Sequence, residues 1–166
     1  MKKFITLNKY GELYIDKILF ETYFPIIFTC KNENNDIFIC VCCQCNENGC
    51  KWLVGRTNGS FIVRMLQNEI TIRQLLLDCC TEKISVDYKN QEYAIAYNNS
   101  DWNEESDYLP KKDAYIDAEG GEFDEEIAYF TSIEHVEYNE EYYKIIIKEL
   151  STIGNTIDPL LDSITA

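Results

Sequence analysis

The chain has little of what the common catalytic motifs require. It contains a single histidine, His135, and it has no phosphate-binding glycine loop, no Walker lysine and no Gly-x-Ser-x-Gly motif. A membrane-spanning helix is predicted by about 18 consecutive apolar residues, and no stretch of the chain approaches that length. The N-terminal apolar segment is broken at Asn8 and Lys9, too early for a signal peptide. The sequence therefore gives no support to an enzyme, and we expect a cytoplasmic protein with reduced cysteines and no cofactor.

Basic residues are also few, and the shortage is concentrated in one region of the chain. The chain has 15 Lys and Arg against 29 Asp and Glu, for a net charge of −14. Residues 101–143 contain 15 of the acidic residues and only two lysines, whereas the rest of the chain has 14 acidic and 13 basic residues. An acidic surface repels nucleic acids and anionic membranes. The charge distribution therefore disfavours direct binding to either and predicts a basic protein as the partner.

What the acidic region does contain is aromatic side chains between the carboxylates. Carboxylates steer a basic partner, and Trp and Tyr rings supply contact area at low entropic cost. This composition predicts a non-enzymatic protein–protein interaction module, with an immunity, anti-toxin or phage-conflict protein as its setting. The bias toward Ile, Asn, Lys, Glu and Tyr is typical of an AT-rich genome and favours a bacterial or phage source. The predicted partner-binding residues are Trp102, Glu104, Glu105, Asp107, Tyr108, Glu122, Asp124, Glu125 and Glu126.

Cysteine is the one abundant residue type that can carry chemistry. Five of the eight cysteines lie within residues 40–50, and two interleaved pairs have the Cys-x-x-Cys spacing of zinc knuckles. Their apolar and β-branched neighbours instead predict a strand, in which side chains alternate between two faces. One face would then carry Cys40 and Cys42, and the other Cys43 and Cys45. An i, i+3 pair on a strand cannot chelate, so most of these cysteines are interpreted as small core residues.

Two alternative functions stay open. Cys45 and Cys50 flank a predicted turn and are expected to face each other, so one alternative is a small zinc-stabilised domain with these two as candidate ligands. The other is a Cys–His hydrolase, because a thiol needs a neighbouring base to act as a nucleophile. His135 lies between Glu134 and Glu137, whose charges raise the pKa of an imidazole, which is the wrong direction for a base that must be unprotonated at neutral pH. We therefore favour the interaction module over both.

Hydrophobic periodicity predicts an α+β fold in which two short helices separate an antiparallel β meander from a second β hairpin. The meander is expected over residues 12–20, 22–30, 37–45 and 50–56. The helices are expected over residues 61–68 and 72–80, with caps at Asn58 or Ser60 and at Thr71. The second hairpin is expected over residues 83–88 and 92–97.

The acidic half has weaker structural signals. We expect a loop over residues 98–108, irregular structure over 110–121, a short helix and then a strand over 124–138, and a helix or strand over 140–150. The domain organisation follows the charge. Residues 1–100 are expected to form the core, and residues 101–166 an acidic, aromatic-rich extension packed on it within one structural domain.

Part of the chain resembles a known family. Pro25 and Phe28, then a hairpin into Trp52-Leu-Val, then a capped helix and Ile70-Thr-Ile-Arg, follow one another over residues 12–80. This order is similar to that of a family of small bacterial domains of unknown function, although Glu69 stands where that pattern often has glycine. The shared residues are mostly apolar. The resemblance therefore implies an α+β core and carries no activity.

Overall fold

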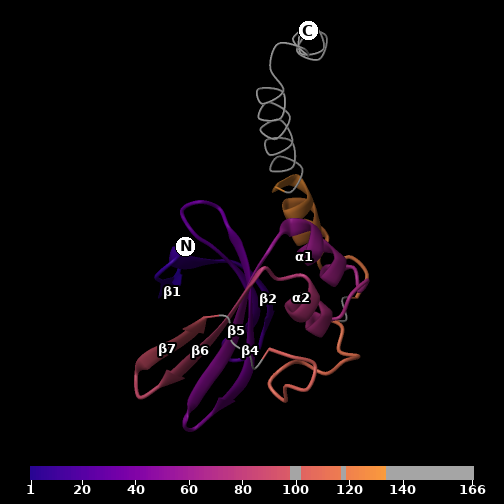
Figure 1. The fold of residues 1–166 in the computed structure, drawn as a ribbon. Coiled ribbons are helices and arrows are strands. Elements are labelled where there is room, and N and C mark those ends of the chain that lie inside the picture. The colour runs from indigo at the N-terminus through magenta and orange to yellow at the C-terminus, as the bar shows by residue number, and fades with distance from the viewer. Residues whose placement is uncertain (98–101, 117–118, 134–166) are drawn as a thin grey trace, which may run out of the picture.

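The computed structural model describes residues 1–97, 102–116 and 119–133 of the chain. Their main element is a seven-stranded antiparallel sheet in which each strand pairs with the next one in the sequence (Figure 1). The strands are β1 (Lys3–Leu7), β2 (Gly11–Glu21), β3 (Pro25–Lys31), β4 (Ile37–Asn46), β5 (Gly49–Thr57), β6 (Glu82–Lys89) and β7 (Glu92–Tyr97).

The sheet curls until its first hairpin meets its last strands. The backbone N–H of Asn8, in the β1–β2 turn, donates to the hydroxyl of Tyr97 on β7 at 2.8 Å. Lys9 and Tyr10 in the same turn both donate to Glu82 at the start of β6. The pairing of β2 with β3 is interrupted by irregularities, and bulges of this kind increase strand twist. The result is a nearly closed sheet with an inner and an outer face.

The inner face carries an apolar core of its own. Phe4 on β1 packs edge-on against Phe28 and Trp52, with ring centroids 5.0 and 5.6 Å apart, and so helps β1 to cover this face. Cross-strand neighbours such as Cys40, Val54 and Ile84 form continuous rows across the sheet. The buried members of this inner core are Ile5, Leu7, Leu13, Phe28, Cys30, Phe38, Cys40, Val54, Ile84 and Val86.

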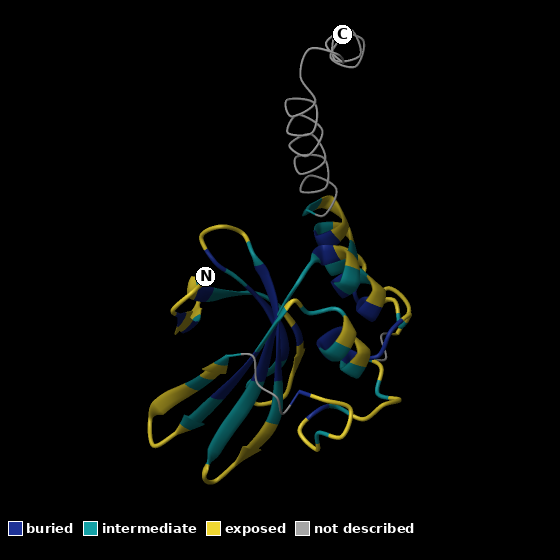
Figure 2. Cartoon of the chain, in the orientation of Figure 1, coloured by how far each residue is buried: buried dark blue, intermediate teal, exposed yellow. Residues whose placement is uncertain are grey.

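Helices cover the outer face. Between β5 and β6 the chain forms α1 (Gly59–Leu66), N-capped by Asn58, and α2 (Ile72–Asp78), which begins with a capping box of Thr71 and Gln74. A third helix, residues 124–133, joins this layer (Figure 2). The outer core combines Leu19, Ile27, Ile39, Val41 and Leu53 of the sheet with Ile62, Met65, Leu66, Ile70, Ile72, Leu75, Leu76, Trp102, Leu109, Phe123 and Phe130.

The sheet and the segment that follows α2 approach each other closely at Gly55 on β5. A Cβ placed on Gly55 would lie 2.4 Å from the Sγ atom of Cys80, just after α2. Any side chain larger than hydrogen would therefore push the end of α2 away from the sheet. Residues 37–41 of β4 are all buried, because helices cover their outer side and β1 and the curled sheet cover their inner side.

The predicted α+β fold class is wrong, because the structure is mostly antiparallel β with three short helices. The strand and helix positions in the first 97 residues were close to those predicted, but their assembly was not. β6 pairs with β5 from Arg56 to Cys50, so the predicted second hairpin extends the first sheet and the two helices are only a connection within it. The strand β1 was not expected at all.

Several sequence expectations lie partly or wholly outside the described residues. These include the loop that begins at residue 98, the strand expected before residue 138, the element over residues 140–150 and His135. Within the described residues, no helix is long and apolar enough to cross a membrane.

Candidate functional site

The acidic region is attached to the outer face by spaced apolar anchors. Trp102, Leu109, Phe123 and Phe130 are each no more than 7% exposed and belong to the outer core. Most of the described residues between these anchors are exposed, and charged side chains there stay hydrated. Buried anchor residues therefore alternate with exposed residues along the sequence. The anchors hold the carboxylates on the layer that covers the outer face of the sheet.

Most of the sequence-predicted site residues are indeed at the surface. The exceptions are Glu126, which is half-buried, and Trp102, which is buried and so is not part of the exposed surface. Glu119, which the sequence prediction omitted, is exposed beside Glu122. We use the name acidic surface for the carboxylates of Glu104, Glu105, Asp107, Glu119, Glu122, Asp124, Glu125 and Glu126.

Nearby arginine does not neutralise these carboxylates. The guanidinium of Arg73 on α2 donates to the backbone carbonyls of Glu104 and Pro110, the second at 3.1 Å. The side chain of Asn103 accepts a hydrogen bond from the N–H of Glu105 at 2.9 Å and tightens the same loop. The loop is thus held through its backbone, and the side chains of Glu104 and Glu105 are exposed.

The ion pairs of the molecule lie elsewhere. Lys3–Glu12, Lys9–Glu82, Lys31–Asp16, Lys51–Asp87, Arg56–Asp36 and Arg64–Glu69 join charges within the sheet or at the end of α1. Residues 102–116 and 119–133 contain nine acidic residues and two lysines, and within the described chain none of these acids is in an ion pair. The acidic surface therefore carries negative charge that the fold itself does not balance.

Part of this charge has a local structural use. Asp124, Glu125 and Glu126 form the first turn of the helix over residues 124–133, where the helix dipole favours negative charge. The carboxylate of Glu122 accepts a hydrogen bond from the N–H of Glu119 at 3.1 Å and closes the turn before that helix. These four residues therefore help to define the helix start. Glu104, Glu105 and Asp107 have no such role.

Two tyrosines join the acidic region to the sheet. The Nζ atom of Lys51 on β5 lies 4.1 Å from the ring centroid of Tyr108, which is 41% exposed. The hydroxyl of Tyr129 donates to Asp16 on β2 at 2.6 Å and accepts from Lys31 on β3. Burial, and then the hydrogen bond to Asp16, raise the pKa of Tyr129 well above its usual range. Tyr108 is thus both exposed and structurally engaged, and Tyr129 fixes the third helix.

The cysteine-rich strand differs from the expected alternation. The pairing of β4 with β5 shifts between Cys42 and Gln44, so Cys43 occupies an irregular position. One extra residue reverses the alternation, and Cys45 therefore shares the inner side with Cys42 rather than the outer side with Cys43. As predicted, Cys45 lies opposite Cys50. The structure joins them as a disulfide with Cα atoms 4.1 Å apart, which differs from the expectation that all the cysteines are reduced.

The remaining thiols are poorly placed for chemistry. Burial raises the pKa of Cys43 to about 11 and that of Cys80 to about 12, and it raises the pKa of Cys40 well above the ordinary value. Thiols with such pKa values stay protonated and weakly nucleophilic at neutral pH. Among the described residues, no three His, Cys, Asp or Glu side chains are grouped as metal ligands.

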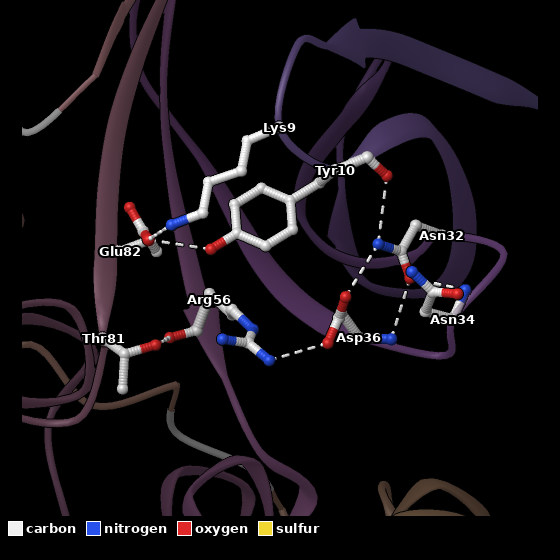
Figure 3. A network of polar contacts seen from close by, with 8 residues as sticks. All are labelled: Lys9, Tyr10, Asn32, Asn34, Asp36, Arg56, Thr81 and Glu82. Carbon is white, nitrogen blue, oxygen red and sulfur yellow. Dashed lines mark hydrogen bonds and ion pairs between the residues drawn. The ribbon is translucent and has the colours of Figure 1, made fainter.

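A second polar cluster lies where the sheet curls shut, and we call it the rim network (Figure 3). Glu82 accepts from Lys9 at 2.6 Å and from Tyr10 at 2.8 Å, while Arg56 donates to Asp36 at 2.8 Å. Hydrogen bonding to Lys9, and then to Tyr10, lowers the pKa of Glu82, and hydrogen bonding to Glu82 raises the pKa of Lys9. Burial raises the pKa of Tyr10.

These shifts move each of the three groups further from neutrality. A general acid or base works best with a pKa near the working pH, so the rim network is not tuned for proton transfer. Its groups come from the β1–β2 turn, the β3–β4 turn, β5 and β6, and their hydrogen bonds hold those segments together. The acidic surface is therefore the stronger candidate for a functional site.

Comparison with known proteins adds no name to this site. No family model, curated protein or solved structure shows a significant match to the chain. The resemblance of residues 12–80 to a family of small bacterial domains stays a prediction.

Proposed function

We propose that the protein is a non-enzymatic interaction module that binds a basic protein partner through its acidic surface. The observation that carries the proposal is the imbalance of charge between the two layers. Within the described chain every ion pair joins residues of the first 97, whereas the eight carboxylates of the acidic surface have no ion-pair partner. Charges held in this way raise the rate at which an oppositely charged partner associates.

The setting we propose is a cytoplasmic immunity, anti-toxin or phage-conflict protein of bacterial or phage origin. In such systems a basic toxin or nucleic-acid-binding protein is neutralised by covering its basic surface. The acidic surface suits that task because its backbone is anchored by Trp102, Leu109, Phe123 and Phe130, so that little order has to be gained on binding.

The test is affinity capture with a matched charge variant. The immobilised chain should retain a basic protein from an extract of its source organism, and salt rising from about 0.05 to about 0.3 M should release it. A variant with amides in place of seven predicted carboxylates should retain none of it. The substitutions are Glu104→Gln, Glu105→Gln, Asp107→Asn, Glu122→Gln, Asp124→Asn, Glu125→Gln and Glu126→Gln. Retention that ignores salt, or that survives in the variant, would contradict the proposal.

A further inference from the structure

A hollow of about 220 Å³ lies between the end of α1 and the turn that precedes the third helix. Leu66 and Phe123, which are 1% and 7% exposed, form its floor together with Ile127. Glu119 and Asp124 line it and are exposed, so they form its rim. We propose that this hollow receives an arginine side chain of the basic partner, an inference that rests on the proposed function and gives it a fixed anchor point.

The size and lining of the hollow suit one long cationic side chain. Pockets for small molecules usually measure about 300–1,000 Å³, so this one is smaller than a typical ligand site. A buried apolar floor accepts methylene groups, and an acidic rim accepts a charged head, which is the division found in Lys and Arg side chains. Phe123 and Leu66 would contact the stem, while Glu119 and Asp124 would contact the head.

Arginine fits better than lysine. A guanidinium is planar, carries five donors and is more weakly hydrated than an ammonium group, so it can serve two separate carboxylates while partly buried. The C-terminal end of α1, at Leu66, adds partial negative charge to the same hollow. Asp124 lies in the first turn of the third helix, where the dipole partly offsets its charge, whereas Glu119 lies outside any helix.

The chain's own nearby arginines are engaged elsewhere. Arg64 in the last turn of α1 pairs with Glu69 at 3.4 Å, and Arg73 on α2 donates to the carbonyls of the loop over residues 104–110. Within the described residues, no arginine of the chain lines the hollow. The site is therefore open to a side chain from a second protein.

Gly120 offers a way to block the hollow without changing its charge. It lines the hollow, a Cβ added there meets no atom within 4 Å, and its backbone is not in the left-handed region. Its neighbour Gly121 is unsuitable because its φ is +86° and a Cβ would lie 3.4 Å from the Asp124 carboxylate. Gly120→Leu should therefore fold normally and occupy space beside Glu119 and Asp124, with Gly120→Ala as the matched control.

The experiment measures the affinity of labelled hexa-arginine and hexa-lysine peptides by fluorescence anisotropy. Wild-type protein and Gly120→Ala should bind hexa-arginine more tightly than hexa-lysine. Gly120→Leu should raise the Kd for hexa-arginine about tenfold, which is the effect of removing one anchor residue worth about 1.4 kcal/mol. Melting temperatures should match among the three proteins, which confirms that the substitutions leave the fold intact.

Two double variants distinguish binding of an arginine in the hollow from general electrostatic attraction to the acidic surface. Glu119→Gln with Asp124→Asn removes the same charge as Glu104→Gln with Glu105→Gln, but only the first pair alters the hollow. The first pair should weaken hexa-arginine binding more. Three outcomes would contradict the proposed arginine site but not the proposed function. They are equal effects of the two pairs, wild-type affinity in Gly120→Leu, and equal binding of both peptides. Absence of any salt-dependent binding in the wild-type protein would overturn the proposed function together with the anchor.

Discussion

The indole Nε1 of Trp102 donates a hydrogen bond of 3.0 Å to the hydroxyl of Ser85 on β6, and both residues are buried. The first described residue of the acidic region is thus a core residue that fixes this region to the sheet. The acidic surface depends on such anchors, because carboxylates that repel one another do not hold a loop in place. Stability and partner binding should therefore respond to different substitutions.

Replacing Trp102 tests this division. Trp102→Ala should lower the free energy of unfolding by about 3–5 kcal/mol, the usual cost of removing a buried aromatic side chain. Trp102→Phe keeps most of the apolar area but loses the hydrogen bond to Ser85, so about 1–3 kcal/mol is expected. Urea denaturation measures both. A loss below about 1 kcal/mol in the alanine variant would show that the acidic region is not anchored at this point.

Tyr129 should make stability sensitive to alkaline pH. Its pKa is raised in the folded state, so its contribution is present below the ordinary value of about 10 and is lost as pH rises through the folded value. Tyr129→Phe should cost about 1.5–3 kcal/mol near pH 7, because the hydroxyl donates to the Asp16 carboxylate. From about pH 10 upward the stabilities of the variant and the wild type should gradually approach each other, and they should become equal only above the raised pKa of folded Tyr129.

Thermal melts at several pH values check the Tyr129 prediction. Tyr115→Phe is the matched control, because Tyr115 is 46% exposed and should tolerate the loss of its hydroxyl. A constant difference between Tyr129→Phe and wild type up to strongly alkaline pH would mean that the hydrogen bond to Asp16 does not stabilise the protonated hydroxyl.

Glu82 in the rim network should make stability sensitive to acidic pH. Its pKa is lowered in the folded state, so its contribution is present above the ordinary value of about 4.3 and is lost as pH falls through the folded value. Glu82→Gln should therefore be less stable than wild type near pH 7, with the gap closing in acid. Glu92→Gln, at an exposed position on β7, should show no such gap. Denaturation curves at pH 7 and about pH 3 decide the matter.

The buried thiols should resist alkylation. Because burial raises the pKa of Cys43 to about 11 and of Cys80 to about 12, iodoacetamide at pH 7 should modify them slowly in the native protein and rapidly in urea. Burial also raises the pKa of Cys42 and Cys79, but less strongly, so these two half-buried thiols should react first. Mass spectrometry of peptides resolves the order. Rapid native modification of Cys43 or Cys80 would revive the hydrolase alternative.

The sequence located most local elements but not their assembly. Turn residues and alternation placed β2 to β7, and Asn58 and Thr71 marked the helix starts, because these signals act over a few residues. The pairing of β5 with β6 joins strands separated by two helices, and no local pattern encodes that contact. The bulge at Cys43 was equally hidden, since one inserted residue changes which face Cys45 occupies without changing composition.

The site was predictable in its charge but not in its geometry. Counting acids located the acidic surface, yet the same composition did not distinguish Trp102, which is buried, from Tyr108, which is exposed. Glu119 was missed because residues 110–121 were expected only to be irregular. Glu119 lines the hollow together with the end of α1, which is distant in the sequence, so no local pattern could identify it.

The most direct test of the account is an NMR titration of isotopically labelled protein with hexa-arginine peptide at low and moderate salt. We predict that the backbone amide signals of residues 104–107 and 119–127 shift, that those of the sheet do not, and that added salt reverses the shifts. Shifts concentrated on the sheet, or shifts that persist unchanged in salt, would contradict the claim that the acidic surface binds a basic partner.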